Sequence, residues 1–173
     1  TLITAEDNIM MEAPLISGIA FTRDEAKLTL RGVKDQPGIA SSILAPISEA
    51  NIEVDMIVQN IGADFSTDFT FTVTRADYEL ARSILMDVSE RIGAQEVLGD
   101  ERIAKLAIVG VGMRSHAGVA AKMFEILAKE SINIQMISTS EIKISVVIDE
   151  KYLELAVRAL HAGFGLEAEQ SAH

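Results

Sequence analysis

The chain has 173 residues, a hydrophobic content of 49% and a formal net charge of −11. This length suffices for two domains of about 70–80 residues or for one domain of medium size. The acidic balance argues against nucleic acid as a partner, because its phosphates would be repelled. Without cysteine there can be no disulfides, thiolate metal sites or cysteine nucleophiles. No apolar run approaches the roughly 18–20 residues that span a bilayer, and no signal peptide opens the chain, so we expect a cytoplasmic protein without a membrane partner.

The sequence contains one unit twice, at a spacing of 80 residues. The recurring positions are Gly32, Gly38, Ala40, Ile52, Met56 and Ile57, which return as Gly112, Gly118, Ala120, Ile132, Met136 and Ile137. An apolar helix face also recurs, as Ile39, Ile43 and Ile47 and then as Val119, Met123 and Leu127. A repeat of this length indicates two copies of one supersecondary unit.

The first copy is predicted to contain a strand, a helix, two strands, a helix and a short strand. Their ranges are 26–33, 38–50, 52–60, 66–74, 75–92 and 95–99. The first strand follows from alternating apolar and polar residues, and the helices follow from apolar residues spaced three or four apart. Pro37 suits a first helical turn, whereas Pro46 is expected to kink or loosen the helix. The order β-α-β-β-α-β is the split βαβ pattern of ferredoxin-like folds.

The second copy lacks its fourth strand. Its predicted strand, helix, two strands and helix cover 103–111, 118–130, 132–140, 143–149 and 151–162. The remaining residues, 163–173, have little β-propensity, whereas the strand-like segment 15–22 has no partner in the first copy. We therefore predict an α+β fold in which the strand 15–22 completes the second copy. The first domain, 23–100, would then be inserted in the second, made of 1–22 and 101–173.

The loop from Val33 to Ala40 carries the sharpest chemistry. Asp35 precedes a helix whose N-terminal amides are free to hold a carboxylate. The carboxylate of Asp35 can hold an ammonium group. Together these groups suit a free α-amino acid, which carries both charges on one carbon. The alternative for Asp35 is an ordinary turn or cap residue.

The chain resembles the paired ACT domains of the aspartokinase family. The resemblance rests on Asp-x-Pro-Gly at 35–38 after a first strand, on the two β-α-β-β-α-β units, and on the run Asn133-Ile-Gln-Met-Ile-Ser-Thr-Ser-Glu-Ile-Lys-Ile-Ser-Val146. Residues 1–4 are similar to the end of the kinase domain in that family, and residues 12–20 to the segment that leads into its regulatory half. The resemblance implies a region that binds lysine, threonine or both and feedback-inhibits aspartate phosphorylation.

The resemblance also implies which residues bind the effector, in a site shared across a homodimer. They are Asp35, Gly38, Ile39, Ala40, Val54, Asp55 and Gln59 from the first unit, and Asn133, Ile134, Thr139 and Ser140 from the second. Glu53 stands where the family usually has asparagine, which could change side-chain selectivity. Ala117 replaces the proline of the second loop, which makes that loop a weaker candidate for a ligand site than the first.

We expect no catalytic centre, cofactor or metal site in this region. A kinase needs a Gly-rich, lysine-bearing nucleotide site, which this sequence lacks, so ATP and Mg²⁺ are expected only in a separate kinase domain or subunit. A start at Thr1 favours the tail of one longer polypeptide over a separate regulatory subunit, and the residues alone leave both open. Gly110-Val-Gly112 fails as a dinucleotide loop, because Ser115 stands at the third glycine position.

Three other functions remain open from the residues alone. One is an ACT-pair sensor attached to another protein, such as a regulator of the glycine-cleavage repressor type. Another is a purely structural dimerisation module. The third is a small α+β enzyme that uses His116 or His161, although neither histidine has a recognisable catalytic partner.

Overall fold

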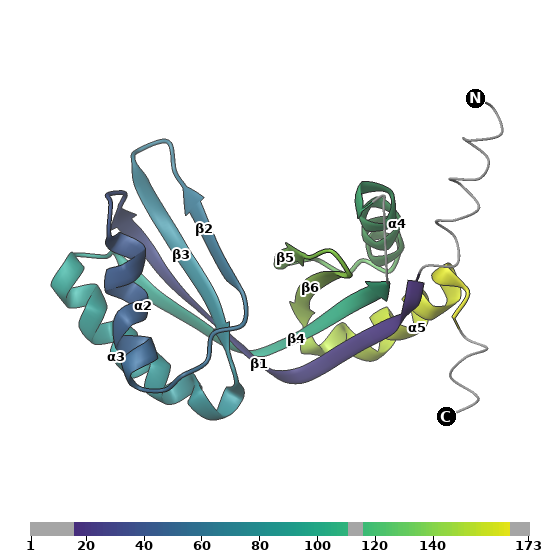
Figure 1. Cartoon of the computed structure of the whole chain (residues 1–173), viewed down its shortest axis with the longest axis horizontal. Coiled ribbons are helices and arrows are strands. Elements are labelled where there is room, and N and C mark those ends of the chain that lie inside the picture. Colours follow the sequence, from purple (N-terminus) through teal and green to yellow (C-terminus); the bar gives the residue numbers. More distant parts are fainter. Residues whose placement is uncertain (1–15, 111–115, 167–173) are drawn as a thin grey trace. The chain divides into compact units, whose positions relative to one another are not determined.

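The computed structural model describes residues 16–110 and 116–166. The chain folds as two compact units (Figure 1). One is continuous, Asp24–Ile103, and is called the inserted unit below. The other combines Thr1–Arg23 with Ala104–His173 and is called the discontinuous unit. The sequence predicted 23–100 for the inserted domain.

Six strands and four α-helices make up the described part of the chain. In order they are β1 (Ile16–Lys34), α2 (Ile39–Glu49), β2 (Ile57–Ile61), β3 (Ser66–Val73), α3 (Tyr78–Ile92), β4 (Glu96–Gly110), α4 (His116–Lys129), β5 (Met136–Thr139), β6 (Lys143–Asp149) and α5 (Leu153–Phe164). Short 3₁₀ turns, Arg75–Asp77 and Glu150–Tyr152, precede α3 and α5. Asp149 caps the second of these turns, since its carboxylate accepts the Lys151 N–H at 3.0 Å.

Two long strands serve both units. The sequence predicts separate strands at 15–22 and 26–33, and at 95–99 and 103–111, but each pair is one continuous strand, β1 or β4. The strand order is β2-β3-β1-β4 in the inserted unit and β1-β4-β6-β5 in the discontinuous unit. The first part of β1 thus takes the edge position that β4 takes in the inserted unit. The predicted α+β fold of two β-α-β-β-α-β-like units is confirmed.

The core of the inserted unit lies between its sheet and one helix layer, α2 and α3 (Figure 1). Leu28 and Leu30 of β1 alternate with polar residues and are fully buried, as the strand period requires. Phe69 and Phe71 of β3 pair with them in an antiparallel register. One face of α2 completes the core with Ile39, Ile43 and Ile47. Although Pro46 was expected to loosen this helix, α2 continues through it to Glu49.

The core of the discontinuous unit repeats this arrangement. Its buried side chains include Leu106 and Ile108 of β4, Val146 of β6, and Met123 and Leu127 of α4. The two helix residues are the repeat equivalents of Ile43 and Ile47, so the sequence repeat is also a repeat of buried positions. No helix within 16–110 or 116–166 is long and apolar enough to cross a membrane.

The two middle strands begin later than predicted. β2 starts at Ile57 and β5 at Met136, not at 52 and 132. In the inserted unit the reason is Thr72, whose side-chain hydroxyl accepts the Met56 N–H at 3.0 Å while its carbonyl accepts the Asp55 N–H. A side chain therefore interrupts the strand ladder, and residues 52–56 form an irregular lead-in to β2.

Candidate functional site

A β-bulge near the end of β1 directs the chain into the loop from Val33 to Ala40, which is called the binding loop below. Leu30 pairs with Phe69 and Val33 with Thr67, so β1 has one residue more than β3 between these pairs. Gly32 lies in the bulge at φ +67°, a conformation that glycine adopts without strain. A Cβ at this position would also collide with the side chain of Gln95.

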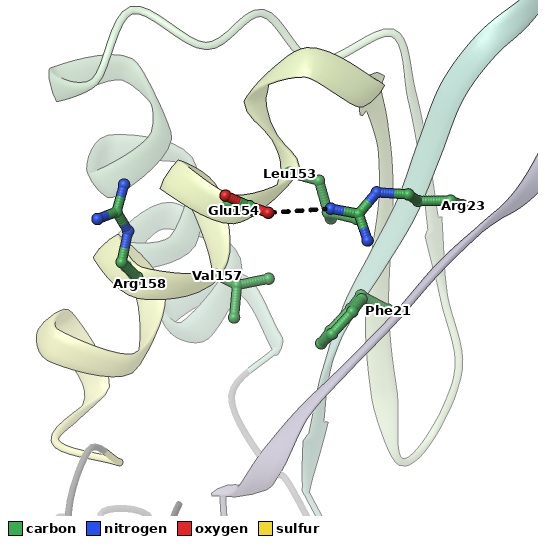
Figure 2. Close-up of a pocket in the computed structure, with 6 residues that line it drawn as sticks. All are labelled: Phe21, Arg23, Leu153, Glu154, Val157 and Arg158. Atoms are coloured by element: carbon green, nitrogen blue, oxygen red, sulfur yellow. Dashed lines mark ion pairs between the residues drawn. The ribbon is translucent and has the colours of Figure 1, made fainter.

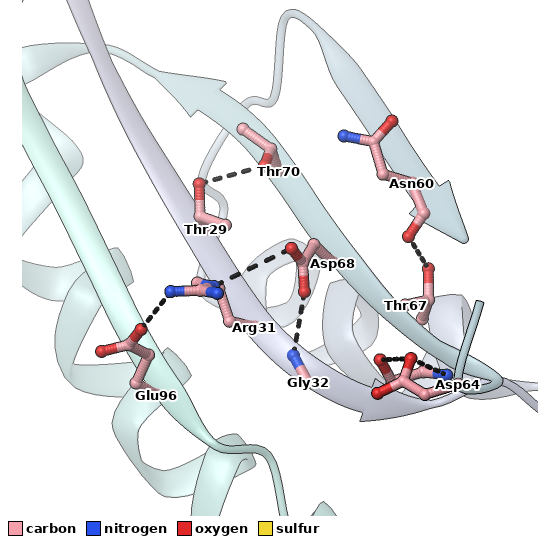
Figure 3. A network of polar contacts seen from close by, with 10 residues as sticks. Thr29, Arg31, Gly32, Asn60, Asp64, Thr67, Asp68, Thr70 and Glu96 are labelled. Atoms are coloured by element: carbon pink, nitrogen blue, oxygen red, sulfur yellow. Dashed lines mark hydrogen bonds and ion pairs between the residues drawn. The ribbon is translucent and has the colours of Figure 1, made fainter. Parts of the chain in front are cut away.

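Polar side chains fix the bulge and the neighbouring strands (Figure 3). One oxygen of Asp68 accepts the Gly32 N–H at 3.0 Å, and the other lies 3.9 Å from Nε of Arg31. Arg31 also donates to Glu96 of β4 at 2.6 Å, so it links three strands of the inserted unit. Asp68 is not among the site residues predicted from the sequence. The sequence feature that could have pointed to a contact here is Gly32, which recurs in the second copy as Gly112.

The hairpin between β2 and β3 holds the binding loop from the other side. Phe65 accepts the Asp35 N–H at 3.1 Å through its carbonyl. Nearby, the hydroxyl and the N–H of Ser66 donate to Asp64 at 2.7 and 3.2 Å (Figure 3). These hydrogen bonds, led by the one from the hydroxyl, lower the pKa of Asp64, so its charged form orders the hairpin at neutral pH.

The binding loop presents a carboxylate beside the start of α2. The Asp35 side chain is exposed and makes no hydrogen bond or ion pair within the described residues. The N–H of Ile39 donates to Gln36, and that of Ser42 to Gly38. Between them, the N–H groups of Ala40 and Ser41 have no backbone acceptor among residues 16–110 and 116–166. The loop therefore offers a carboxylate shortly before the start of α2 and free amides in the first turn of that helix.

Ile39 differs from the other loop residues in its position. Its side chain is 6% exposed and belongs to the core, and its N–H bonds to Gln36. Any contact that Ile39 makes with a ligand is therefore secondary to its packing role.

Gly38 begins α2 in the left-handed conformation, at φ +88°. A Cβ there would meet nothing within 4 Å, so a substitution would cost backbone strain without a steric clash. We expect Gly38→Ala to lower the free energy of unfolding by about 1 kcal/mol, measured by urea denaturation. Gly18→Ala is the matched control, because Gly18 also has open space but no positive φ. Equal stability of both variants would contradict this role of Gly38.

Val54 and Asp55 lie away from the binding loop within the inserted unit. The Asp55 N–H bonds to Thr72, whereas the Asp35 N–H bonds to Phe65. These two acceptors are separated by about 20 Å of mostly extended chain. The loop and the Val54–Asp55 segment are therefore at opposite ends of β3, and one inserted unit does not bring them together.

The Val54–Asp55 segment borders a cavity of its own. This cavity has a volume of about 220 Å³ and is lined by Glu25, Glu53, Val54, Asp55, Val73 and Thr74. Glu53, the departure from the family pattern, is exposed at its rim and adds a negative charge. Three carboxyl groups thus line one small cavity, but the described residues contain no cluster of acidic or histidine side chains that could hold a metal ion.

The other predicted site residues follow the edge strands. Gln59 is exposed on β2, the edge strand of the inserted unit. Thr139 is the last residue of β5, the edge strand of the discontinuous unit, and Ser140 follows it. Asn133 is exposed and Ile134 is half-buried in the lead-in to β5. The four residues from the second unit lie 80 residues after Glu53, Val54, Gln59 and Asn60, so they occupy the equivalent positions of the repeat.

The loop of the second copy can be compared only in part. Gly112 and Ser115 lie outside the described residues, and Ala117 is exposed in the first turn of α4. Of the histidines considered for catalysis, His161 is buried in α5. This burial explains His161 as a core residue of the discontinuous unit.

Comparisons with known proteins agree with the repeat and the fold. The ACT domain family model matches twice, at residues 29–88 and 106–164. An aspartate kinase of Pseudomonas fluorescens (strain SBW25) is 70% identical over 168 residues, which are 97% of this chain and 41% of that protein. This chain therefore spans less than half the length of that curated relative.

Solved structures show the same similarity. The ligand-free regulatory subunit of aspartate kinase from Thermus thermophilus has a TM-score of 0.82 and 41% identity, over 87% of this chain and 99% of that chain. Aspartokinase III of E. coli in complex with lysine and aspartate has a TM-score of 0.69 and 25% identity, over 87% of this chain and 33% of that chain. The chain therefore belongs to the ACT domain family, and it matches the regulatory region of aspartokinases along most of its length.

Proposed function

We propose that this chain is the amino-acid-binding regulatory module of an aspartate kinase, and that it mediates feedback inhibition by lysine, threonine or both. The observation that carries the proposal is the exposed Asp35 carboxylate in the loop that leads into α2, together with the free N–H groups of Ala40 and Ser41 in the first turn of that helix. The ammonium group of the effector would bind Asp35, and its α-carboxylate would bind the helix amides. The E. coli aspartokinase III complex with lysine supports this class of ligand.

The effector site is proposed to form between two copies of the chain. Within one inserted unit, Asp35 and Asp55 lie at opposite ends of β3, so a pocket that uses all the predicted residues needs a second copy. The edge strands favour such an assembly. β2 exposes 52% of Ile57 and 68% of Ile61, and β5 exposes 46% of Ile137. Edge strands with exposed apolar residues are templates for pairing with another chain.

In this arrangement the binding loop of one inserted unit would face the edge of the partner's discontinuous unit. Asn133, Ile134, Thr139 and Ser140 would then contact the effector side chain. Because the ligand bridges two chains, its binding favours one arrangement of the dimer over others, and a coupling of about 1–3 kcal/mol to the kinase part suffices for inhibition. ATP and Mg²⁺ would bind the kinase part and not this module.

Calorimetric titration of the chain with L-lysine and with L-threonine tests the proposal. We expect at least one of them to bind, and Asp35→Asn to weaken that binding by about tenfold or more, because a charge-assisted hydrogen bond is lost. Asp87→Asn, an exposed carboxylate on α3, is the matched control and should leave the affinity unchanged. Undiminished affinity in Asp35→Asn, or no binding of either amino acid to the unmodified chain, would overturn the assignment.

A further inference from the structure

The discontinuous unit has a cavity that the proposed function does not use. Its volume is about 410 Å³, and it lies between β1 and the start of α5 (Figure 2). It is lined by Phe21, Arg23, Leu153, Glu154, Val157 and Arg158. None of these residues belongs to the predicted effector site, and the volume lies in the range of small-molecule pockets, about 300–1,000 Å³.

The cavity is positively charged on an acidic protein. Its two guanidinium groups and one carboxylate sum to +1, whereas the whole chain carries −11. Arg23 and Glu154 form an ion pair at 3.6 Å, with side chains 49% and 84% exposed (Figure 2). A pair this long and exposed contributes little to stability, so Arg23 can turn to an incoming anion at little cost.

Arg158 provides a second guanidinium group. It is exposed on α5 and makes no ion pair with any residue in 16–110 or 116–166. Guanidinium groups bind carboxylates through paired, charge-assisted hydrogen bonds. The guanidinium group of Arg158 is therefore available to bind an anion in the cavity.

Part of the cavity wall is apolar. Phe21 projects from β1 and remains 51% exposed, and Val157 of α5 lies opposite it (Figure 2). An exposed phenyl ring beside arginines suits a ligand that has both an apolar body and a negative charge. Inorganic phosphate would satisfy the arginines but leave this wall in water.

We propose that this cavity binds a small carboxylate whose apolar body packs on Phe21 and Val157 while the exposed side chains of Arg158 and Arg23 turn toward its charge. The site differs in place from the proposed effector site, because none of the residues that line it is among the predicted effector-binding residues. A ligand here needs no ammonium group, and Glu154 would be its only nearby carboxylate among the described residues.

The test is an amide-resolved NMR titration of the full 173-residue chain with 3-phenylpropionate. We expect shifts at residues 21–23 and 153–158, and about five- to tenfold weaker binding in Arg158→Gln, as for loss of one charge-assisted pair. Arg23→Gln should weaken binding similarly. Arg82→Gln, an exposed arginine of the inserted unit, is the matched control and should leave the dissociation constant unchanged.

Two further probes separate charge from apolar packing. The neutral analogue 3-phenylpropionamide should bind about tenfold more weakly than the acid, and inorganic phosphate should also bind more weakly. Equal binding of acid and amide would overturn the role of the arginines. Phosphate that binds as well as the acid would overturn the role of the apolar wall. Shifts outside the cavity, or an unchanged dissociation constant in folded Arg158→Gln, would overturn the site itself.

Discussion

Replacing Phe71 with alanine is expected to lower the free energy of unfolding of the inserted unit by about 3–5 kcal/mol. Phe71 is fully buried at the centre of β3, where it pairs with Leu28 of β1 and Ile57 of β2. Its ring lies 6.3 Å from that of Phe69, so the truncation also removes an aromatic contact. Because the free energy of unfolding of a small domain is only about 5–15 kcal/mol, this unit would come close to unfolding.

Hydrogen exchange resolved by residue is the measurement for this variant. The two apolar cores share no buried residue, so faster exchange should be concentrated in β2, β3 and α3, and α4 and β6 should keep their protection. Met86→Ala, which truncates a half-exposed side chain on α3, is the control and should cost less than about 1 kcal/mol. Equal loss of protection in both units would show that they unfold as one body, against the separation of their cores.

Much of this fold could be predicted from periodicity and the repeat alone. Each of the four helices begins and ends within two residues of its predicted segment, except that a 3₁₀ turn occupies the predicted start of α3. The agreement is close because apolar spacing decides which helix face is buried. The need of the second copy for a borrowed strand followed from counting strands. Both predictions depend only on local pattern and chain order.

The continuity of β1 and β4 was not predictable in the same way. Residues 22–25, Thr-Arg-Asp-Glu, carry no apolar alternation, so the pattern breaks where β1 passes from one unit to the other. Contacts from Arg75 explain why the strand persists in the inserted unit. The Arg75 N–H bonds to Asp24, and its guanidinium donates to the carbonyls of Glu25 and Ile103 at 3.2 and 2.9 Å. A side chain distant in sequence thus satisfies backbone groups, which local pattern cannot reveal.

The candidate site was likewise predictable only in part. Asp35 and the start of α2 could be placed from the Asp-x-Pro-Gly run, because turn and helix-start chemistry is local. The anchoring of this loop by Asp68 and Phe65 could not, since both contacts depend on strand register. The cavity at Phe21 and Arg158 was also missed, because it joins two segments far apart in the sequence.

A mixing experiment is expected to restore tight effector binding from two variants that each bind the effector weakly. If each site combines Asp35 of one chain with Thr139 of its partner, Asp35→Asn and a bulky Thr139→Tyr variant should each bind the effector at least about tenfold more weakly as a homodimer. A mixed dimer would have one site with both defects and one site with neither. Random exchange of equal amounts should therefore restore about a quarter of the sites, as the two-fold symmetry of such a dimer requires.

The measurement is calorimetric stoichiometry after the two variants have been mixed, unfolded in urea and refolded together. Co-refolding each variant with itself is the control and should restore nothing. If each site lay within one chain, every site would carry one of the two substitutions, so no tight binding would be recovered. Recovery of about a quarter with the affinity of the unmodified chain would support the shared site. Its absence, with mixed dimers demonstrated by native mass spectrometry, would place Asp35 and Thr139 in separate or intrachain sites.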